Sequence, residues 1–423
     1  MTRVHLTPAR ARGTATAPPS KSYTHRALLV GHLAHRPFRI RDPLVADDTR
    51  ATARALAALG TRVQRGPHEW LLRPGPGRRR GSRRTIDCGA SGTTLRFATA
   101  LAALAPGTTR LTGTERLGER PMAELLDALR ALGARSTSRD GGLPLAITGP
   151  MLGGRARLEA SRSSQFVSAL LLTLPVCPRD SVVQLSGPIV SAPYIAATRA
   201  VMARHGISLP PGDRTLRIRG RQVYRGGQFQ VPGDASSAAY LWAAAAVSGG
   251  DVRVEGVPTS WPQADLAILP LLARNGAEVV RTSRGARVRA GPRRAFTVDL
   301  TDAPDLYPLA GVLAATTPGA SRLRGAAHVV LKESDRRAGT ARLARALGAR
   351  VQFRAGGLDI RGTAQPRSFA VGDLDDHRLV MSAAVGALAA DGVSTIGDAH
   401  AVAKSFPAFW TVLGSLTGRR GGP

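Results

Sequence analysis

A unit of about 70 residues that occurs six times constrains the fold of this chain more than any other feature. Each unit contains a short alternating strand that ends in glycine or aspartate, and successive strand ends lie 69 to 74 residues apart. The predicted strands cover residues 38–42, 109–113, 183–187, 252–256, 321–325 and 394–398. An amphipathic helix follows each strand and usually ends before a glycine, as helix C-caps do. Six similar α/β units predict a pseudo-repeat architecture rather than six independent domains.

Each unit also contains a second, more apolar helix whose first residues are polar. The six helix starts are Ser20-Lys21-Ser22, Ser91-Gly92-Thr93, Ser163-Ser164-Gln165, Asp234-Ala235-Ser236-Ser237, Pro304-Asp305 and Asp375-Asp376-His377-Arg378. Serine, threonine and aspartate are typical N-cap residues, so each start can be an ordinary helix cap. The free N–H groups and the dipole at a helix N-terminus also favour anions. Several such ends beside lysine or arginine predict a pocket for phosphates and carboxylates, in an α/β fold with helices packed on several mixed sheets.

The balance of charged residues is strongly basic, with 59 Lys+Arg against 29 Asp+Glu and a formal net charge of +30. That charge suggests nucleic acid or another polyanion as a partner. Only three of the basic residues are lysines, namely Lys21, Lys332 and Lys404, and Asn275 is the one asparagine. Their joint scarcity indicates GC-rich coding, which explains arginine in place of lysine but not the small number of acidic residues. A site that needs a compact ammonium group does not accept arginine, so we predict that the three lysines are functional.

Several classes of protein are excluded by what the chain contains. No uninterrupted apolar stretch reaches the roughly 18 to 20 residues of a membrane span, and the N-terminus lacks the apolar region of a secretory signal. The two cysteines, Cys88 and Cys177, provide neither a metal cluster nor a disulfide framework, and we expect both in the core. These features predict a cytoplasmic protein without a bound metal.

Ten motifs carry the polar residues of the helix starts and the loops near them. In chain order they are PPSKSYTHRAL (18–28), CGASGTTLRF (88–97), ERPMAELLDALRALGA (119–134), SRSSQFVSALLL (161–172), SAPYI (191–195), GDASSAAYLWAAAA (233–246), DAPDLYPLA (302–310), LKESDR (331–336), DDHRL (375–379) and AKSFPAF (403–409). This series strongly resembles the EPSP synthases, a family also called 3-phosphoshikimate 1-carboxyvinyltransferases, from near Val4 to near Phe409. One motif is a weak signal, whereas ten in the same order and spacing are specific.

The resemblance implies a fold of the α/β (α+β) class with two similar domains. Each domain consists of three repeated strand–helix units, an inside-out α/β barrel, and a double crossover hinge joins the two. One domain spans 19–231, on the shikimate 3-phosphate side, and the other combines 1–18 with 232–423. The active site is expected in the cleft between the domains.

The resemblance also implies a reaction. The family transfers the enolpyruvyl group of phosphoenolpyruvate to the 5-hydroxyl of shikimate 3-phosphate and releases phosphate, through a tetrahedral intermediate. The step belongs to chorismate and aromatic amino acid biosynthesis and is the target of glyphosate. It uses no metal and no organic cofactor. We therefore expect small anionic substrates, a monomer, and neither a membrane nor a specific nucleic acid as partner.

Motif by motif, the resemblance assigns residues to the two anionic substrates. Shikimate 3-phosphate is expected to contact Lys21, Ser22, Arg26, Ser163, Ser164, Gln165, Ser191, Tyr194, Asp305, His328 and Lys332. Phosphoenolpyruvate is expected to contact Lys21, Gly92, Arg120, Gln165, Arg336, Arg378 and Lys404. Bidentate arginine suits a planar carboxylate or a phosphate, and the lysines supply mobile point charges.

The acid–base chemistry is assigned to two carboxylates. Asp305 is expected to take the proton of the attacking hydroxyl, and Glu333 to protonate the methylene carbon and later remove that proton. Lys332 and Lys404 are expected to tune these carboxylates and to stabilise charge in the intermediate, and Lys21 and Lys404 are counted with Asp305 and Glu333 as catalytic residues. For Asp305, a helix N-cap after Pro304 is the structural alternative. For the LKESDR run, the alternative is an exposed, charged helix start.

Two positions depart from the commonest pattern of the family. Ala90 stands where an asparagine often helps to contact phosphoenolpyruvate, and Ser91 is a possible substitute. His328 stands where some members have asparagine on the shikimate side, and histidine can donate a hydrogen bond there too. These changes bear on affinity and inhibitor sensitivity more than on the reaction.

Three functions are alternatives to the EPSP synthase reaction. The related transferase that acts on UDP-N-acetylglucosamine usually carries a reactive cysteine in the loop at 113–119, and GTERLGE has none. A polyanion- or RNA-end-binding protein of the same repeat fold is suggested by the net charge and by the basic run at 78–84, but no aromatic residue lies closer to that run than Trp70. We expect the run to be a solvated turn. An inactive homologue is disfavoured because all three lysines and both carboxylates are present.

Overall fold

The structure is a computed structural model that describes residues 2–74, 84–212 and 214–419. Most of the basic run at 78–84 lies outside these residues. The helices are α1 (Lys21–Leu33), α2 (Asp47–Ala58), α3 (Gly92–Ala102), α4 (Glu115–Gly118), α5 (Ala123–Ala131), α6 (Ser164–Thr173), α7 (Ala192–Arg204), α8 (Ala235–Ser248), α9 (Ile268–Asn275), α10 (Tyr307–Ala315), α11 (Arg336–Ala346), α12 (His377–Ala387) and α13 (Phe409–Leu416). Short 3₁₀ turns are η1 (Leu174–Val176), η2 (Ala264–Ala267), η3 (Pro304–Leu306), η4 (Ala327–Leu331) and η5 (Ala399–Lys404).

The strands are short and occur in every repeat. They are β1 (Val4–Leu6), β2 (Arg12–Thr16), β3 (Phe38–Arg41), β4 (Arg62–Arg65), β5 (Glu69–Arg73), β6 (Arg84–Asp87), β7 (Gly107–Thr112), β8 (Arg135–Arg139), β9 (Gly142–Gly149), β10 (Arg155–Glu159), β11 (Ser181–Ser186), β12 (Thr215–Ile218), β13 (Gly227–Gln230), β14 (Asp251–Glu255), β15 (Glu278–Thr282), β16 (Gly285–Arg289), β17 (Thr297–Asp299), β18 (Gly319–Arg324), β19 (Arg350–Arg354), β20 (Gly357–Gly362), β21 (Ala370–Val371) and β22 (Ser394–Ile396). The six strands predicted from the repeat are confirmed as β3, β7, β11, β14, β18 and β22.

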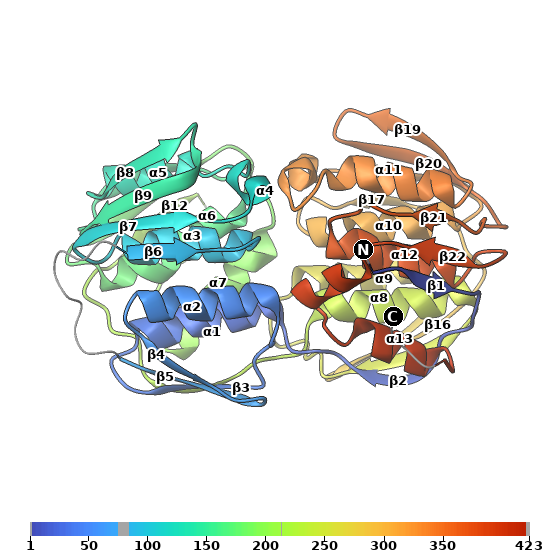
Figure 1. Cartoon of the computed structure of the whole chain (residues 1–423), viewed down its shortest axis with the longest axis horizontal. Helices are drawn as coiled ribbons and strands as arrows, with labels where there is room; N and C mark the ends of the chain where they lie inside the picture. The colour runs from blue at the N-terminus through green and yellow to red at the C-terminus, as the bar shows by residue number, and fades with distance from the viewer. Residues whose placement is uncertain (1, 75–83, 213, 420–423) are drawn as a thin grey trace. The chain divides into compact units, whose positions relative to one another are not determined.

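The chain divides into two compact units (Figure 1). One unit is Pro19–Val231, and the other combines Met1–Pro18 with Pro232–Pro423. We call the first the central unit, because it is the middle of the sequence, and the second the terminal unit, because it holds both chain ends. Each unit contains three of the six repeats.

Every repeat builds one small mixed sheet. In the central unit the strand orders are β13-β3-β5-β4, β6-β7-β9-β8 and β10-β11-β12. In the terminal unit they are β15-β16-β14-β2, β17-β18-β20-β19 and β1-β22-β21. In the four-stranded sheets one strand runs parallel to its neighbour and the other three form antiparallel pairs, as in β2 with β14 and β14 with β16. The expectation of helices packed on several mixed sheets is therefore confirmed.

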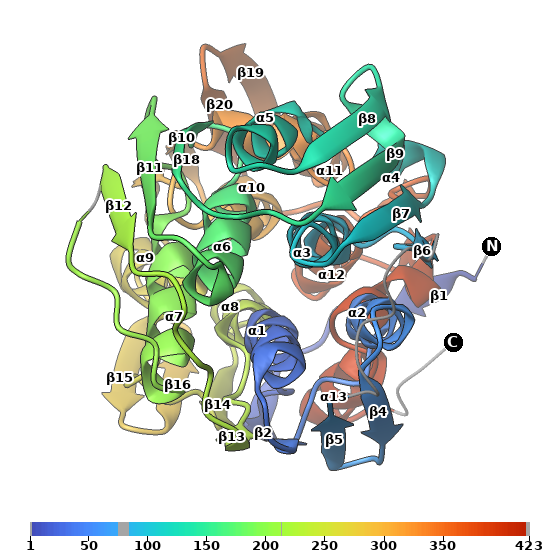
Figure 2. The same cartoon turned by 90° about the vertical axis from the view of Figure 1, so that its left-hand side faces the viewer.

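The most apolar helices are enclosed by the rest of their unit. In the central unit α1, α3 and α6 are buried on nearly all sides, and in the terminal unit α8, α10 and α12 are buried in the same way. Figure 2 faces the central unit and shows these inner helices with strands β4, β8 and β12 toward the rim. A helix that is apolar all round has no face for solvent, so its polar start is the one part that can serve a site.

The ends of the helices follow the chemistry predicted from the sequence in most repeats. Ser91, Ser163, Asp234 and Asp376 each accept a backbone N–H at the start of their helix through the side chain. Ser20 occupies the N-cap position of α1 without such a bond. Gly60 follows α2 with φ 99°, a backbone conformation that side chains with a Cβ rarely adopt.

Both cysteines are buried free thiols, as expected from the sequence. Burial raises the pKa of Cys88 and of Cys177 to about 12. Among the residues that the structure describes, no helix is both long and apolar enough to cross a membrane.

Candidate active site

The predicted site residues fall into two sets, one within each unit. In the central unit the first set begins at α1, where Lys21 is the first helical residue. Its ammonium Nζ lies 3.1 Å from Oδ2 of Asp48, a buried carboxylate in the first turn of α2. The pair holds a lysine charge at the N-terminus of a helix, where anions are favoured.

Arg26 joins two of the other predicted contacts. Its buried guanidinium donates from Nη1 to the carbonyl of Ser22 and from Nη2 to the carbonyl of Tyr194, both at 2.8 Å. Nε donates to the hydroxyl of Thr198 at 2.8 Å. Burial lowers the pKa of Arg26 to about 10, which leaves it charged at neutral pH. Arg26 therefore ties the start of α1 to the start of α7.

The start of α3 is packed against two guanidinium groups. A Cβ built on Gly92 would lie 2.5 Å from Nη1 of Arg120 and closer still to Nη1 of Arg96. Both arginines are buried. Only glycine at this position lets the two cations approach the free N–H groups of the helix.

Gln165 lies in the first turn of α6 and contacts the same region. Its amide Nε2 donates to Thr93 Oγ1 at 3.1 Å, and its Oε1 accepts from Arg96 Nη1 at 3.3 Å. Ser163 caps α6 by accepting the N–H of Gln165, and Ser164 is buried beside it. The structure thus places the helix start Ser163-Ser164-Gln165, which is expected to contact shikimate 3-phosphate, next to the start of α3.

Ser191 begins α7 from an unusual backbone conformation. Its φ is 56°, in the left-handed region that few residues other than glycine adopt. The carbonyl of Ser191 accepts the N–H of Tyr194 at 3.1 Å. Strain of this kind is typical of functional sites, where the surrounding fold imposes it.

The second set lies in the terminal unit and centres on Arg336, the first residue of α11. Its side chain is 1% exposed and donates to three carboxylates from separate segments of the chain. Nη1 lies 2.6 Å from Asp305, Nη2 lies 2.9 Å from Glu333, and Nε lies 2.8 Å from Asp376. Burial lowers the pKa of Arg336, but the three carboxylates outweigh it and raise the pKa above its ordinary value.

Arg378 completes the arrangement from α12. Its Nη2 lies 2.6 Å from the second oxygen of Asp305, and its backbone N–H is capped by Asp376. Burial raises the pKa of Asp305, but Arg378, Arg336 and the nearby Lys332 outweigh it and hold the pKa far below the usual range. Asp305 belongs to the turn η3 and makes ion pairs there, so the alternative of a simple N-cap for α10 is wrong.

Glu333 connects this network to the third lysine. Its Oε1 lies 3.9 Å from the ammonium of Lys404, which ends η5, and both side chains are mostly buried. His328 lies in η4, where burial, assisted by Lys332, lowers its pKa to about 3 and keeps the imidazole neutral. The LKESDR run therefore leads into α11 with Arg336 buried in an ionic cluster, while Asp335, the N-cap, is exposed.

Several residues of these clusters were missed by the sequence analysis. Asp48, Arg96 and Asp376 make direct polar contacts with predicted residues, yet none was assigned a role. Arg96 was detectable as a charged residue inside an apolar helix. Asp376 was visible only as a cap, because its partner Arg336 lies 40 positions away.

Two residues close to Asp305 were also missed by the sequence analysis. Tyr240 is buried on α8, and burial raises its pKa to about 12 despite the nearby Arg378. Asp265 of η2 accepts the hydroxyl of Ser236, and burial together with the charge of Asp305 raises its pKa. Tyr240 and Asp265 therefore stay neutral more readily than Asp305 does.

Comparison with known proteins decides the family. A family model described as EPSP synthase (3-phosphoshikimate 1-carboxyvinyltransferase) matches residues 6–413. The chain belongs to the EPSP synthase family. Proteins named 3-phosphoshikimate 1-carboxyvinyltransferase from Methanocorpusculum labreanum and Halobacterium salinarum are 40% and 44% identical to it. The first match covers 94% of both chains, and the second covers 97% of this chain and 98% of the relative.

Solved structures of the EPSP synthase family share the fold. An EPSP synthase from Acinetobacter baumannii matches with a TM-score of 0.79 and 24% identity, over 99% of this chain and 98% of that one. A second structure of EPSP synthase from the same organism matches with a TM-score of 0.77. The two-domain, inside-out α/β fold expected for the EPSP synthase family is therefore confirmed.

Proposed function

We propose that this chain transfers the enolpyruvyl group of phosphoenolpyruvate to the 5-hydroxyl of shikimate 3-phosphate, giving 5-enolpyruvylshikimate 3-phosphate and phosphate. The observation that carries the proposal is the pairing of Asp305 with both Arg336 and Arg378, beside Glu333 and Lys404. Two carboxylates for proton transfer stand among cations suited to an anionic substrate. The family and the names of the relatives support the same reaction.

The two sets of residues divide the substrates between them in this proposal. The central unit binds shikimate 3-phosphate at the starts of α1, α6 and α7, where Lys21, Ser22, Ser163 and Ser164 offer charge and hydroxyls. Gly92, Arg120 and Gln165 contribute to phosphoenolpyruvate from the central unit. The terminal unit contributes Arg336, Arg378 and Lys404 to phosphoenolpyruvate, and Asp305, His328 and Lys332 to shikimate 3-phosphate.

The proposed reaction has an addition and an elimination. In the addition, the 5-hydroxyl oxygen bonds to C2 of phosphoenolpyruvate, the hydroxyl proton passes to Asp305, and C3 receives a proton from Glu333. In the elimination, Glu333 removes a proton from C3, the C2–O bond to phosphate breaks, and the electron pair leaves with phosphate. The proton on Asp305 leaves with the phosphate or through solvent, which restores both carboxyl groups.

The ion pairs of Asp305 suggest how substrate binding activates it. A carboxylate held between two guanidinium groups at 2.6 Å is a weak base, because its pKa lies far below the working pH. When the carboxylate or phosphate of phosphoenolpyruvate takes bonds from Arg336 and Arg378, Asp305 loses part of that stabilisation. Its pKa then rises, and the base becomes stronger once the substrate is bound.

The first test measures phosphate release from phosphoenolpyruvate by the purified protein. Release is expected to require shikimate 3-phosphate and to fall by at least a thousandfold in Asp305→Asn, which keeps the shape of the side chain. Release with UDP-N-acetylglucosamine instead would favour the related transferase. No release with either acceptor from folded protein would refute the proposal. Arg39→Gln is the matched control, because its partner Glu69 is a surface carboxylate.

We also propose that the enzyme acts as a monomer in the cytoplasm, because every residue assigned to the reaction belongs to one chain and both substrates are ionic metabolites. Light scattering on the eluting protein tests the first part: a single species of 44.3 kDa is expected. A stable dimer at assay concentrations would contradict it.

A further inference from the structure

Part of the positive charge of the chain is gathered on the sheet β17-β18-β20-β19 of the terminal unit. Its solvent face presents Arg322 on β18, Arg350 on β19 and Arg361 on β20. Arg350 and Arg361 are direct partners in the antiparallel register, and Arg322 is two residues along β18 from the partner of Arg361. Among the described residues none of the three makes an ion pair. Asp359, which is the direct partner of Arg322 in the register, instead forms ion pairs with Arg324 and Arg354.

The fold alone does not account for this arrangement. Like charges directly opposite each other across a strand pair are destabilising. Charged residues on an edge strand do prevent pairing with other chains, and that explains Arg350, because β19 is the edge of the sheet. Arg361 lies on the interior strand β20, where it protects no edge and repels Arg350.

An aromatic side chain is exposed on the same edge strand but on the opposite face of the sheet, because Phe353 is three residues from Arg350 and pairs with the buried Leu358. Phe353 is 47% exposed and is the one aromatic residue among the exposed large apolar side chains of the described residues. The guanidinium carbons of Arg337 and Arg345, from α11, lie 5.9 and 5.6 Å from the centre of its ring. A ring that projects from a basic edge offers a base a surface on which to stack.

We propose that the β19 edge of this sheet, which has Arg350 and Arg361 on one face and Phe353 on the other, binds single-stranded nucleic acid without sequence preference. We call it the β19 patch: Arg322, Arg337, Arg345, Arg350, Phe353 and Arg361. The arginines contact backbone phosphates, and Phe353 stacks against a base as the strand passes over the edge. Arginine without lysine suits phosphate contact. The ring favours a single strand over a duplex, whose bases are already stacked.

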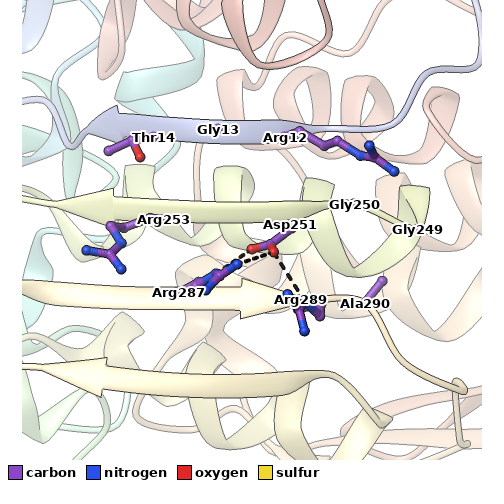
Figure 3. Close-up of a pocket in the computed structure, with 10 residues that line it drawn as sticks. All are labelled: Arg12, Gly13, Thr14, Gly249, Gly250, Asp251, Arg253, Arg287, Arg289 and Ala290. Carbon is purple, nitrogen blue, oxygen red and sulfur yellow. Dashed lines mark hydrogen bonds and ion pairs between the residues drawn. The ribbon is translucent and has the colours of Figure 1, made fainter.

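A second sheet of the terminal unit provides a matched comparison. On β15-β16-β14-β2, Arg253 faces Arg287 in the register much as Arg350 faces Arg361. There Asp251 binds Arg287 at 2.6 Å and Arg289 at 3.2 Å, and the three line a shallow pocket of about 800 Å³ (Figure 3). Asp251 thus neutralises part of the positive charge of Arg287 and Arg289, and this face therefore serves as the control surface.

The experiment measures binding of a fluorescein-labelled oligodeoxythymidine by anisotropy over a range of salt concentrations. The double variant Arg350→Gln/Arg361→Gln is expected to weaken binding and to lower the slope of log affinity against log salt by about 1.4, the value for two lost phosphate contacts on a single strand. Phe353→Ala is expected to lower the affinity about 5- to 100-fold with little change in slope. Arg253→Gln/Arg287→Gln removes the same charge and is expected to bind nearly as the unchanged protein does.

Four results would overturn the proposal. They are no binding at low salt, equal losses in the two double variants, tighter binding of a duplex of the same length, and no effect of Phe353→Ala. Equal losses would mean that the net charge of +30 acts without a defined site. Melting temperature and phosphate release, measured for every variant, exclude unfolding as the cause, because none of these residues belongs to the proposed active site.

Discussion

Replacing Asp376 by asparagine tests whether the buried ion pairs of the terminal unit organise the site. Asp376 is 0% exposed, and each of its two oxygens accepts from Arg336 and from a second donor, which is Ser334 for Oδ2 and the backbone of Arg378 for Oδ1. Oδ2 accepts Arg336 Nε at 2.8 Å, and Oδ1 accepts the backbone N–H of Arg378 at 2.9 Å. An asparagine amide has one accepting oxygen, so either orientation turns an NH₂ group toward one of these donors.

The size of the effect follows from burial. Removing the charge of one partner from a buried ion pair costs at most about 3–5 kcal/mol here, because Asp305 and Glu333 still compensate part of the charge of Arg336. For a unit of this size the melting temperature is expected to fall by at most roughly 6 to 20 °C. Activity measured well below that temperature is expected to fall at least tenfold in kcat/KM for phosphoenolpyruvate, because the Arg336 guanidinium loses the bond that fixes its plane.

The control is Asp359→Asn in the same unit. Asp359 also binds two arginines, Arg324 at 2.5 Å and Arg354 at 2.9 Å, but it is 25% exposed. Water replaces part of what is lost there, so the expected cost is below about 1 kcal/mol and activity is unchanged. Thermal melting and steady-state kinetics of both variants decide the matter. Equal melting temperatures for the two variants would refute the argument from burial.

Three further predictions concern other parts of the molecule. Gly92→Ala places a Cβ 2.5 Å from Arg120 Nη1, so the guanidinium must move by about 1 Å to reach ordinary contact. We expect KM for phosphoenolpyruvate to rise about 10- to 100-fold while KM for shikimate 3-phosphate stays the same. A KM for phosphoenolpyruvate equal to that of the unchanged protein would contradict this. Because the pKa of Asp305 is lower in the folded chain than the value of about 3.9 in an unfolded one, its stabilising contribution is present above about pH 4 and is lost as the pH falls further. The difference in unfolding free energy between the unchanged protein and Asp305→Asn, measured in urea, is therefore expected to be constant from pH 7 to 5 and to shrink toward pH 3. Cys88 and Cys177 are expected to resist an aromatic disulfide reagent at pH 8 and to react at once in denaturant, and rapid labelling of the native protein would show that they are not buried.

The repeat and the helix starts could be predicted from the sequence because their signals are local. A strand that ends in glycine, a helix that ends before Gly60 or Gly276, and a serine or aspartate at an N-cap each depend on a few neighbouring residues. The same chemistry recurs six times, so a weak signal in one unit was supported by the other five. Asp305 shows the limit of the local signal, because its position after Pro304 is typical of a cap and its side chain instead bonds to Arg336 and Arg378.

The partners of the site residues could not be predicted, because they come from segments far apart in the chain. Arg336 bonds to Glu333 in its own motif, but its other two carboxylates, Asp305 and Asp376, come from distant segments whose composition does not identify them as its partners. The scarcity of lysine pointed to Lys404 as functional, and the structure adds that its neighbour is Glu333. The same scarcity carries no information about Asp48, the partner of Lys21, since aspartate is not depleted in the same way.

The ionic network also explains why so many buried charges are compatible with a stable fold. A buried guanidinium alone would be strongly destabilising, whereas Arg336 has three carboxylates within 3 Å, and Asp305 in turn has a second arginine. Three carboxylates stand against four cations, counting Lys332 and Lys404, so most of the positive charge of the cluster is already compensated. In the proposed reaction, an arriving trianionic substrate exchanges partners with carboxylates already in place. Binding by exchange leaves Asp305 less stabilised than before, and this links recognition of the substrate to the strength of the base that the reaction requires.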